Sequence, residues 1–192
     1  MGATKPLLAK LKSRKVMKAS ELAPYISTRT QLRRMVEAGK LIALGSGIYA
    51  HPTLDPFTAS LIAAAKYYPT AVISNITALV IHGLSDERVD RIDVDIPRNS
   101  SIRNRLLCTH RVPDHKIVGA IKLDYNGHKI RVYCQERALC DAYRIDPDGP
   151  IFLKAMKRYV KNGGTNADLI AEYDEVVSTN VLRSLRQELA DG

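Results

Sequence analysis

Residues 19–50 read ASELAPYISTRTQLRRMVEAGKLIALGSGIYA and contain the clearest local pattern of the chain. A short helix in the first part of this stretch is expected to end at Pro24, because proline interrupts the hydrogen bonds of a helix. A second helix is expected to begin at Thr28, which stands at capping-box spacing from Gln31, and to end at Gly39. The pattern therefore predicts two helices joined by a tight turn.

The second of these helices is amphipathic. Its apolar residues Leu32, Met35 and Val36 recur at helical spacing on one face and should pack inward. Basic and polar residues occupy the other face, namely Arg29 and Arg33 with Thr30 and Arg34 beside them.

Two short apolar runs follow this helix, at residues 41–44 and 48–50. They flank Gly45-Ser46-Gly47, and two strands around a small glycine-rich turn predict a hairpin. A hairpin directly after a helix-turn-helix is the wing of a winged helix. We therefore predict a winged helix-turn-helix domain over residues 1–52.

The positive charge of the chain is concentrated in this segment. Residues 1–52 contain ten Lys and Arg against two Glu, a balance of +8 within a net charge of +9. Residues 53–192 contain nineteen basic and eighteen acidic residues. Such a concentration is expected of a module that binds nucleic acid. The sequence thus indicates a DNA-binding domain.

The geometry of a winged helix assigns roles to these residues. The second helix is expected to enter the major groove with its first residues nearest the bases. The candidates for reading bases are Thr28, Arg29, Thr30 and Arg33. Charge and position make Lys12, Arg14, Lys15, Lys18, Arg34 and Lys40 candidates for phosphate contacts. The small wing-tip residues Ser46 and Gly47 are expected to approach the DNA backbone or minor groove.

The rest of the chain, residues 53–192, predicts an α+β domain with a small antiparallel sheet and helices. Residues 91–97 alternate as a strand, and Asn126-Gly127 is a strong hairpin signal between two further strands. The expected helices cover residues 56–68, 74–82, 135–143, 151–160 and 167–189, which gives a helical tail from about residue 150. His82 is expected to bond free carbonyls at a helix end.

Two groups of side chains raise the question of a metal. Asp93 and Asp95 share one strand face and suggest a metal-dependent nuclease, but the glutamate and lysine of such sites do not follow. A solvent-facing edge of a half-buried strand is the preferred interpretation. Cys108, His110 and His115 lack the paired spacing of structural zinc sites. We therefore expect no metal, no cofactor and no enzymatic activity, with a nuclease as a distant alternative.

Three segments together resemble a known family. The winged helix ending in Gly47-Ile48-Tyr49-Ala50, the stretch ISNITALVIHGL at residues 73–84 and QERALCD at residues 135–141 resemble the AbiEi antitoxins of bacterial abortive-infection systems, which act in phage defence. The resemblance covers roughly residues 6–145. It implies a transcriptional autorepressor that binds inverted repeats in its own promoter. It also implies an antitoxin C-terminal domain that opposes a nucleotidyltransferase-like toxin in a type IV toxin–antitoxin system.

One alternative to this reading is a stand-alone winged-helix transcription factor. Its C-terminal domain would sense a ligand or dimerise. The chain has no apolar run of the roughly 18–20 residues that a membrane span needs, and no signal-peptide pattern at its start. Its three cysteines form no close pair, so a reducing cytoplasm is the expected location.

Overall fold

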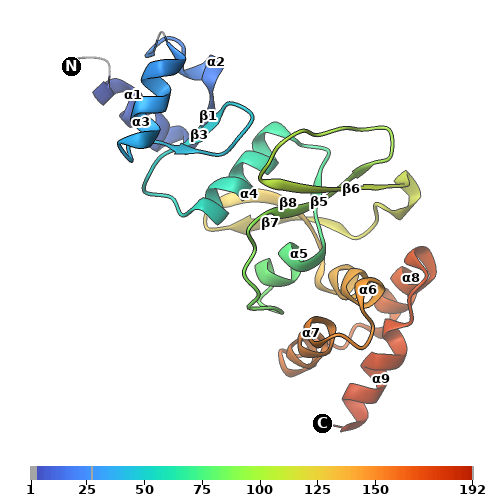
Figure 1. Cartoon of the computed structure of the whole chain (residues 1–192). Helices are drawn as coiled ribbons and strands as arrows, with labels where there is room; N and C mark the ends of the chain where they lie inside the picture. The colour runs from blue at the N-terminus through green and yellow to red at the C-terminus, as the bar shows by residue number, and fades with distance from the viewer. Residues whose placement is uncertain (1–3, 27, 192) are drawn as a thin grey trace.

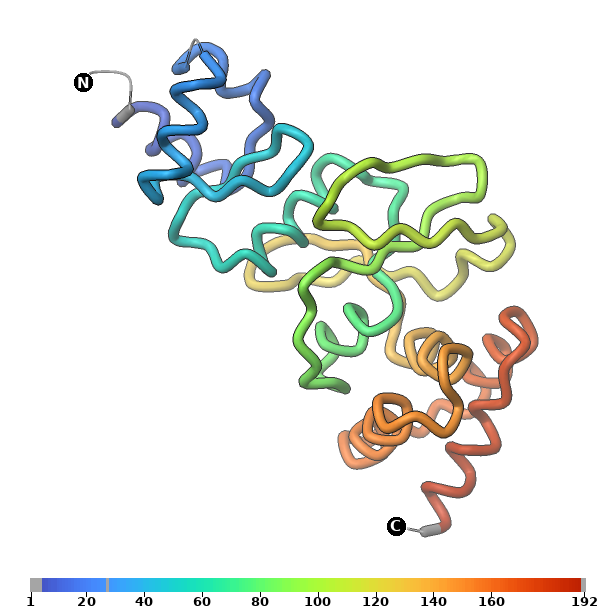
Figure 2. Tube along the Cα trace, in the orientation of Figure 1, coloured from blue at the N-terminus to red at the C-terminus, as the bar shows by residue number. Residues whose placement is uncertain are grey.

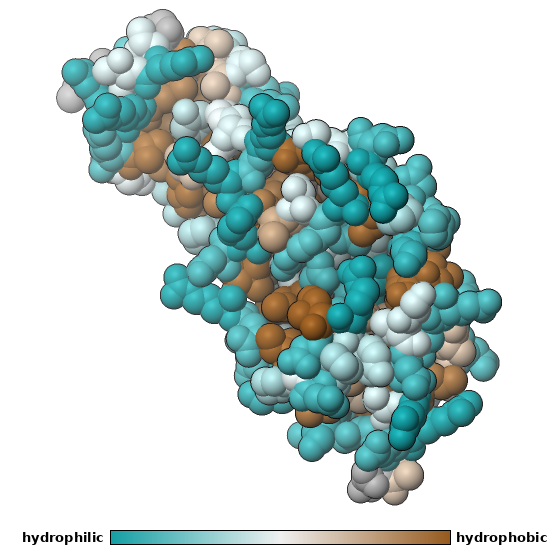
Figure 3. Space-filling view, turned by 45° about the vertical axis from the view of Figure 1, so that its right-hand side comes forward, coloured by the Kyte–Doolittle hydropathy of each residue, from teal (hydrophilic) through white to brown (hydrophobic). Residues whose placement is uncertain are grey.

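The computed structural model describes residues 4–26 and 28–191. Figures 1 and 2 show an elongated chain in three parts, with a small helical domain at the N-terminal end, a sheet in the middle and a group of helices at the C-terminal end. On the face drawn in Figure 3, hydrophilic side chains cover most of the surface, and the hydrophobic ones lie in smaller patches between them.

The N-terminal part is a winged helix, as predicted. A three-stranded antiparallel sheet of order β1-β3-β2 closes it, with Val16 opposite Ala50. Strand β1 was not predicted from the sequence, because three residues are too few to show an alternating pattern. The elements are α1 (Thr4–Arg14), β1 (Val16–Lys18), α2 (Ala19–Leu22), α3 (Arg29–Glu37), β2 (Ile42–Ala43) and β3 (Ile48–Ala50).

Both ends of α3 are fixed by local chemistry. The Thr28 hydroxyl oxygen accepts a hydrogen bond from the Gln31 backbone N–H at 3.2 Å, which satisfies one free donor at the start of the helix. At the other end Gly39 has a φ of +65°. The Lys40 N–H donates to the Met35 carbonyl there, and the Gly39 N–H donates to the Val36 carbonyl. This is a Schellman motif, and it ends the helix where the sequence predicted.

The second part is built on a five-stranded sheet of order β6-β5-β4-β8-β7. The α+β class is confirmed, but the sheet is mixed where a small antiparallel one was expected: β5 runs parallel to β6, and β4 parallel to β8. The predicted hairpin is present as β7 and β8, and Asn126 and Gly127 both have positive φ. The strands are β4 (Val72–Ile73), β5 (Ile92–Pro97), β6 (Leu107–Val112), β7 (Ala120–Tyr125) and β8 (His128–Tyr133).

Helices cover both faces of this sheet, and the last four helices of the chain form the third part (Figure 1). The helices are α4 (Pro56–Tyr67), α5 (Asn75–Ile81), α6 (Gln135–Ile145), α7 (Pro150–Lys161), α8 (Ala167–Val177) and α9 (Val181–Asp191), with a 3₁₀ turn η1 (Asp114–Lys116). The expected helix over 167–189 is two helices, because Ser178 adopts a left-handed conformation between them. Across residues 4–26 and 28–191, no helix is both long and apolar enough to cross a membrane.

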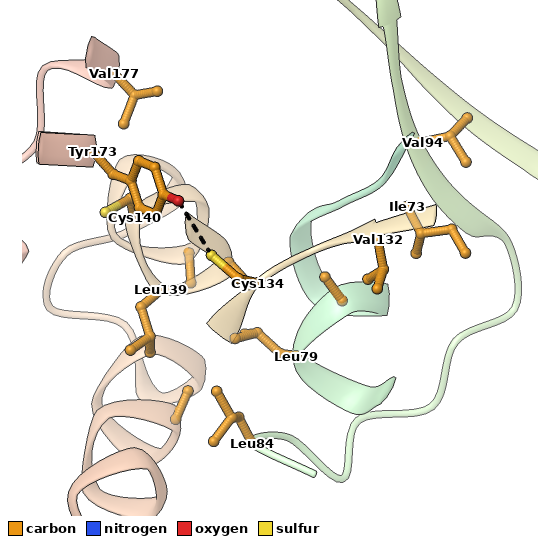
Figure 4. Packing of buried hydrophobic residues seen from close by; sticks show 14 of the residues in the cluster. Ile73, Leu79, Leu84, Val94, Val132, Cys134, Leu139, Cys140, Tyr173 and Val177 are labelled. Carbon is orange, nitrogen blue, oxygen red and sulfur yellow. Dashed lines mark hydrogen bonds between the residues drawn. The ribbon is translucent and has the colours of Figure 1, made fainter. Parts of the chain in front are cut away.

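One hydrophobic cluster joins the sheet to these helices. Figure 4 shows it running from Val94 and Val132 in the sheet past Leu79 of α5 to Leu139 of α6. At its far end the Cys134 thiol donates to the Tyr173 hydroxyl at 3.6 Å, which ties the end of β8 to α8. The helical tail therefore belongs to the core of the second domain.

Helix α4 joins the winged helix to the second domain. Ala59, Ile62 and Ala63 on one side of α4 pack with Val16 and Ile48 of the winged helix. Leu61 and Ala64 instead belong to the core of the five-stranded sheet. The two parts therefore share one helix in their packing.

A polar network at the rim of this junction is centred on Glu21. Its carboxylate accepts hydrogen bonds from the Lys18 N–H at 2.8 Å, from the Tyr67 hydroxyl and from Lys66 at 3.2 Å. Lys66 also donates to the Val16 carbonyl at 2.8 Å. Burial alone would raise the pKa of Glu21, but these hydrogen bonds outweigh it and lower the pKa to about 2.

We expect Glu21→Gln to destabilise the chain by about 1–3 kcal/mol at pH 7, because it removes charge-assisted hydrogen bonds. A carboxyl whose pKa is lowered in the folded state stabilises above its ordinary value of 4.5 and loses that contribution as the pH falls toward 2. The difference between parent and variant should therefore shrink between pH 7 and pH 3. Urea unfolding followed by circular dichroism at both pH values measures it.

Glu37→Gln is the matched control for this experiment. Glu37 pairs with Arg33 on the exposed face of α3, where both side chains are more than half exposed. Loss of this exposed ion pair in Glu37→Gln should change the free energy of unfolding by about 0.5 kcal/mol or less. An equal loss for Glu21→Gln at both pH values would contradict the role assigned to the Glu21 carboxylate.

Candidate nucleic-acid interface

Helix α3 presents a polar row to solvent, as the sequence predicted. Leu32 is buried beneath the helix, while Met35 and Val36 are half-buried against the same core. The side chains of Arg29, Thr30, Arg33 and Arg34 are all exposed. The helix therefore offers three guanidinium groups on a rigid element, and guanidinium groups match the acceptor pair of guanine in the major groove.

Two of the predicted base-reading residues also have partners within the chain. Thr28 caps α3, so its oxygen accepts from the Gln31 N–H, and its hydroxyl hydrogen and second lone pair remain for a ligand. The Arg33 Nε lies 2.7 Å from a Glu37 carboxylate oxygen, although the Arg33 side chain is 81% exposed. This pair is accessible to solvent and therefore weak, so a phosphate or a base edge can replace Glu37.

The predicted phosphate-contacting residues fall into two groups. Lys12, Arg34 and Lys40 are exposed. Arg14 instead pairs with Glu21 at 3.3 Å, and the Lys18 ammonium lies 4.6 Å from the centre of the Tyr67 ring. Arg14 and Lys18 therefore also contact residues at the junction between the winged helix and α4.

Positive charge gathers around the end of α1. Burial lowers the pKa of His51, and the nearby charges of Lys12 and Lys15 lower it further. Lys15 has a φ of +65°, and its carbonyl accepts from the His51 N–H at 3.1 Å. Lys15 thus ends α1 as well as contributing charge.

The wing-tip residues Ser46 and Gly47, which are predicted to approach DNA, are exposed and also make contacts within the chain. The Ser46 hydroxyl donates to the Arg103 carbonyl at 2.6 Å, and the Gly47 carbonyl accepts from the Ala19 N–H at 2.7 Å. Gly45, Ser46 and Gly47 all have positive φ, which makes the turn tight. The wing tip is therefore held against residues 98–106 of the second domain.

Residues 98–106 form a basic segment that was not predicted from the sequence as a site for DNA. Arg103 and Arg105 are exposed, and with Arg91, Gly45 and Ser46 they line an open hollow of about 630 Å³ beside the wing. The available signal was the absence of acidic residues from Ile96 to Pro113, a stretch with four arginines. This local excess of positive charge is hidden when the charge is summed over residues 53–192, where basic and acidic residues nearly balance.

The interpretation of Asp93 and Asp95 as a solvent-facing strand edge is wrong for Asp95, whereas the Asp93 side chain is 18% exposed. β5 lies inside the sheet between β4 and β6, and Asp95 is fully buried. Its carboxylate accepts from the Tyr133 hydroxyl at 3.1 Å. The polar face of this strand is covered by α5 and α6, because both faces of a central strand in a layered fold are packed.

A buried ion pair lies beside Asp95. Arg137 and Asp141 of α6 are 1% and 0% exposed, and their charged atoms are 2.5 Å apart. The Arg137 guanidinium also lies 4.5 Å from the centre of the Tyr133 ring. Burial raises the pKa of Asp141, and the charge of Arg137 opposes that rise. Arg137 and Asp141 therefore balance each other's charge inside the protein, since a buried charge needs such a partner.

His82 does bond a backbone carbonyl, but the carbonyl belongs to a different element from the one expected. Its Nε2 lies 2.7 Å from the Tyr133 carbonyl oxygen, so the imidazole joins α5 to the end of β8 rather than bonding carbonyls of its own helix. Burial lowers the pKa of His82, which favours the neutral imidazole.

The structure brings Asp93 together with Cys108 and His110. Cys108 stands opposite Asp93 in the register of β5 and β6, and the His110 Nε2 lies 2.9 Å from an Asp93 carboxylate oxygen. The hydrogen bond to Asp93 raises the pKa of His110 despite burial. His115, the third residue considered in the sequence, lies apart from these side chains in η1.

Comparison with known proteins supports the fold alone. No protein-family model matches the chain, and no curated protein matches its sequence. Among solved structures, the chain is similar to the RV2827C protein from Mycobacterium tuberculosis, known from a crystal structure. The match has 15% sequence identity and a TM-score of 0.64, and covers 90% of this chain and 71% of that one.

Proposed function

We propose that this chain is a cytoplasmic, sequence-specific DNA-binding protein that represses transcription. The observation that carries the proposal is the exposed row of Arg29, Thr30 and Arg33 on the second helix of a winged helix. In helix-turn-helix proteins this helix enters the major groove and its first residues contact base edges. Arginine paired with guanine O6 and N7 is the commonest specific contact of that kind.

The cations around α3 supply the affinity in this proposal. Lys12, Arg34 and Lys40 are exposed and free to neutralise phosphates. Arg103 and Arg105 extend the basic surface into the second domain, because the wing tip is hydrogen-bonded to residue 103. Contacts from both domains would fix the register of the protein on the duplex.

The resemblance to AbiEi antitoxins extends this proposal. It makes the promoter of the chain's own operon, with inverted repeats, the DNA that is bound. It makes the second domain an antitoxin that opposes a nucleotidyltransferase-like toxin. The three segments that carry the resemblance are the winged helix, β4 with α5, and the first turns of α6.

The base-reading role is tested by comparing Arg33→Ala with Arg34→Ala. Arg33→Ala should weaken binding to the upstream DNA by about 5- to 150-fold, the value of one lost bidentate contact, with little change on a scrambled duplex. Arg34→Ala should weaken both complexes alike and reduce the salt slope by about 1. Fluorescence anisotropy across a salt series measures both.

Lys161→Ala is the control for this pair, because Lys161 is exposed at the end of α7, far from the winged helix in Figure 1. It should leave both affinities unchanged. If Arg33→Ala binds both duplexes as the parent does, α3 is not the base-reading element.

The basic segment beside the wing gives a second prediction. Replacing both Arg103 and Arg105 by alanine should weaken binding to upstream and scrambled DNA by the same factor and lower the salt slope by up to about 2. The matched control is Arg88→Ala, an exposed arginine in the connection between α5 and β5. If the salt slope of the double variant equals that of the parent, these two arginines do not contact the DNA.

The antitoxin part is tested separately from DNA binding. Cells that express the toxin gene next to this one should grow again when this chain is supplied from an unrelated promoter. Arg33→Ala should restore growth equally well, because the second domain carries the antitoxin role in this proposal. Failure of both proteins to restore growth, with specific DNA binding intact, would leave a stand-alone transcription factor.

A further inference from the structure

Three side chains of different chemistry converge on one face of the five-stranded sheet. Asp93 lies on β5, and Cys108 and His110 lie two residues apart on β6, so both point to the same face. The carboxylate, thiol and imidazole ligand atoms all lie within 4.8 Å of one another. All three side chains are partly exposed, so a small ion can reach them from solvent.

The carboxylate of Asp93 is held in place by a further residue. The Thr77 hydroxyl of α5 donates to one carboxylate oxygen at 3.1 Å, and the Asp93 N–H donates to the same hydroxyl at 2.9 Å. The other carboxylate oxygen faces His110. Such second-sphere hydrogen bonds orient the ligands of metal sites.

The charges around the trio favour a cation. The buried carboxyl of Asp95 lies on the same strand face and stands opposite His110 in the register. The guanidinium of Arg91 donates to the Leu107 carbonyl at 2.6 Å. A metal ion that binds Cys108 displaces the proton of its thiol.

We propose that Asp93, Cys108 and His110 form a binding site for a divalent transition-metal ion of the Zn²⁺ type. One sulfur, one nitrogen and one oxygen ligand suit Zn²⁺ and Co²⁺, whereas Mg²⁺ and Ca²⁺ require oxygen ligands alone. Binding releases the thiol proton, together with the imidazolium proton where His110 is charged. Three protein ligands leave the fourth tetrahedral position to water or to a ligand.

This site is independent of the proposed DNA binding. None of its three residues belongs to α3 or to the wing, and metal binding is measured without DNA. The sequence raised the question of a metal at Asp93 with Asp95 and, separately, at Cys108 with His110 and His115, and the expectation for both groups was no metal. The pairing of β5 with β6 replaces both groups by a mixed set that the sequence order hides.

Titration of the reduced, metal-free protein with Co²⁺ tests the site. We expect one ion per chain, with the visible bands of tetrahedral cobalt and a near-ultraviolet thiolate-to-cobalt band, both removed by one equivalent of Zn²⁺. Cys108→Ser should abolish the thiolate band, and His110→Ala should weaken binding at least about 10-fold. Zn²⁺ should raise the unfolding temperature of the parent more than that of either variant.

His115→Ala is the control, because it removes an exposed histidine outside the trio and should bind cobalt as the parent does. Thr77→Val keeps all three ligands and should weaken binding about 10- to 100-fold if the threonine orients Asp93. Circular dichroism of the metal-free variants verifies that they fold. A thiolate band that persists in Cys108→Ser, or no binding at about 100 μM Co²⁺, would leave Asp93 and His110 as an ion pair only.

Discussion

The packing of α4 is the constraint on which the rest of the structure depends. Every residue from Thr58 to Ala64 is buried, and a helix that is apolar nearly all round must be covered on more than one side. The three-stranded sheet of the winged helix covers one side, and the five-stranded sheet covers another. Its small alanines let both sheets approach closely. The winged helix is thus fixed to the second domain by a shared core and not by a linker.

Electrostatics at this junction follow from the same packing. The C-terminal end of α4 brings Lys66 and Tyr67 to Glu21, so one of the two acidic residues of the winged helix is used inside the protein. The other, Glu37, pairs with Arg33 on the surface. Most of the cations therefore have no acidic partner among residues 1–52 and give that end of the molecule its positive charge. The wing tip then meets residues 98–106, whose arginines continue the basic surface.

The second domain places polar groups where a sheet core is normally apolar. Asp95, Tyr133, Arg137 and Asp141 are all at most 1% exposed. Removing one partner of a buried ion pair such as Arg137 with Asp141 typically costs about 3–5 kcal/mol. Toward solvent the same strand face continues into Asp93, Cys108 and His110. The interior network and the accessible trio are therefore parts of one polar layer between the sheet and α5 and α6.

Local patterns in the sequence determined the winged helix, both ends of α3, the β7–β8 hairpin and the exposed arginines. These features depend on capping residues, glycines with positive φ and helical periodicity, all of which act within a few residues along the chain. The sequence also indicated most of the helices of the second domain. It misjudged Asp95 as exposed, because alternation along one strand does not reveal whether a helix covers the polar face.

Only the tertiary structure decided which residues far apart in the sequence come into contact. The parallel pairing of β5 with β6, the contact of the wing with Arg103 and the meeting of Glu21 with Lys66 join residues 15 to 57 positions apart. Such contacts depend on sheet order and on how two cores share α4, and neither is encoded in a local period. The candidate base-reading residues could therefore be named from the sequence. The basic segment could be recognised in the sequence by its charge but could not be placed beside the wing, and the Asp93–Cys108–His110 trio could not be named.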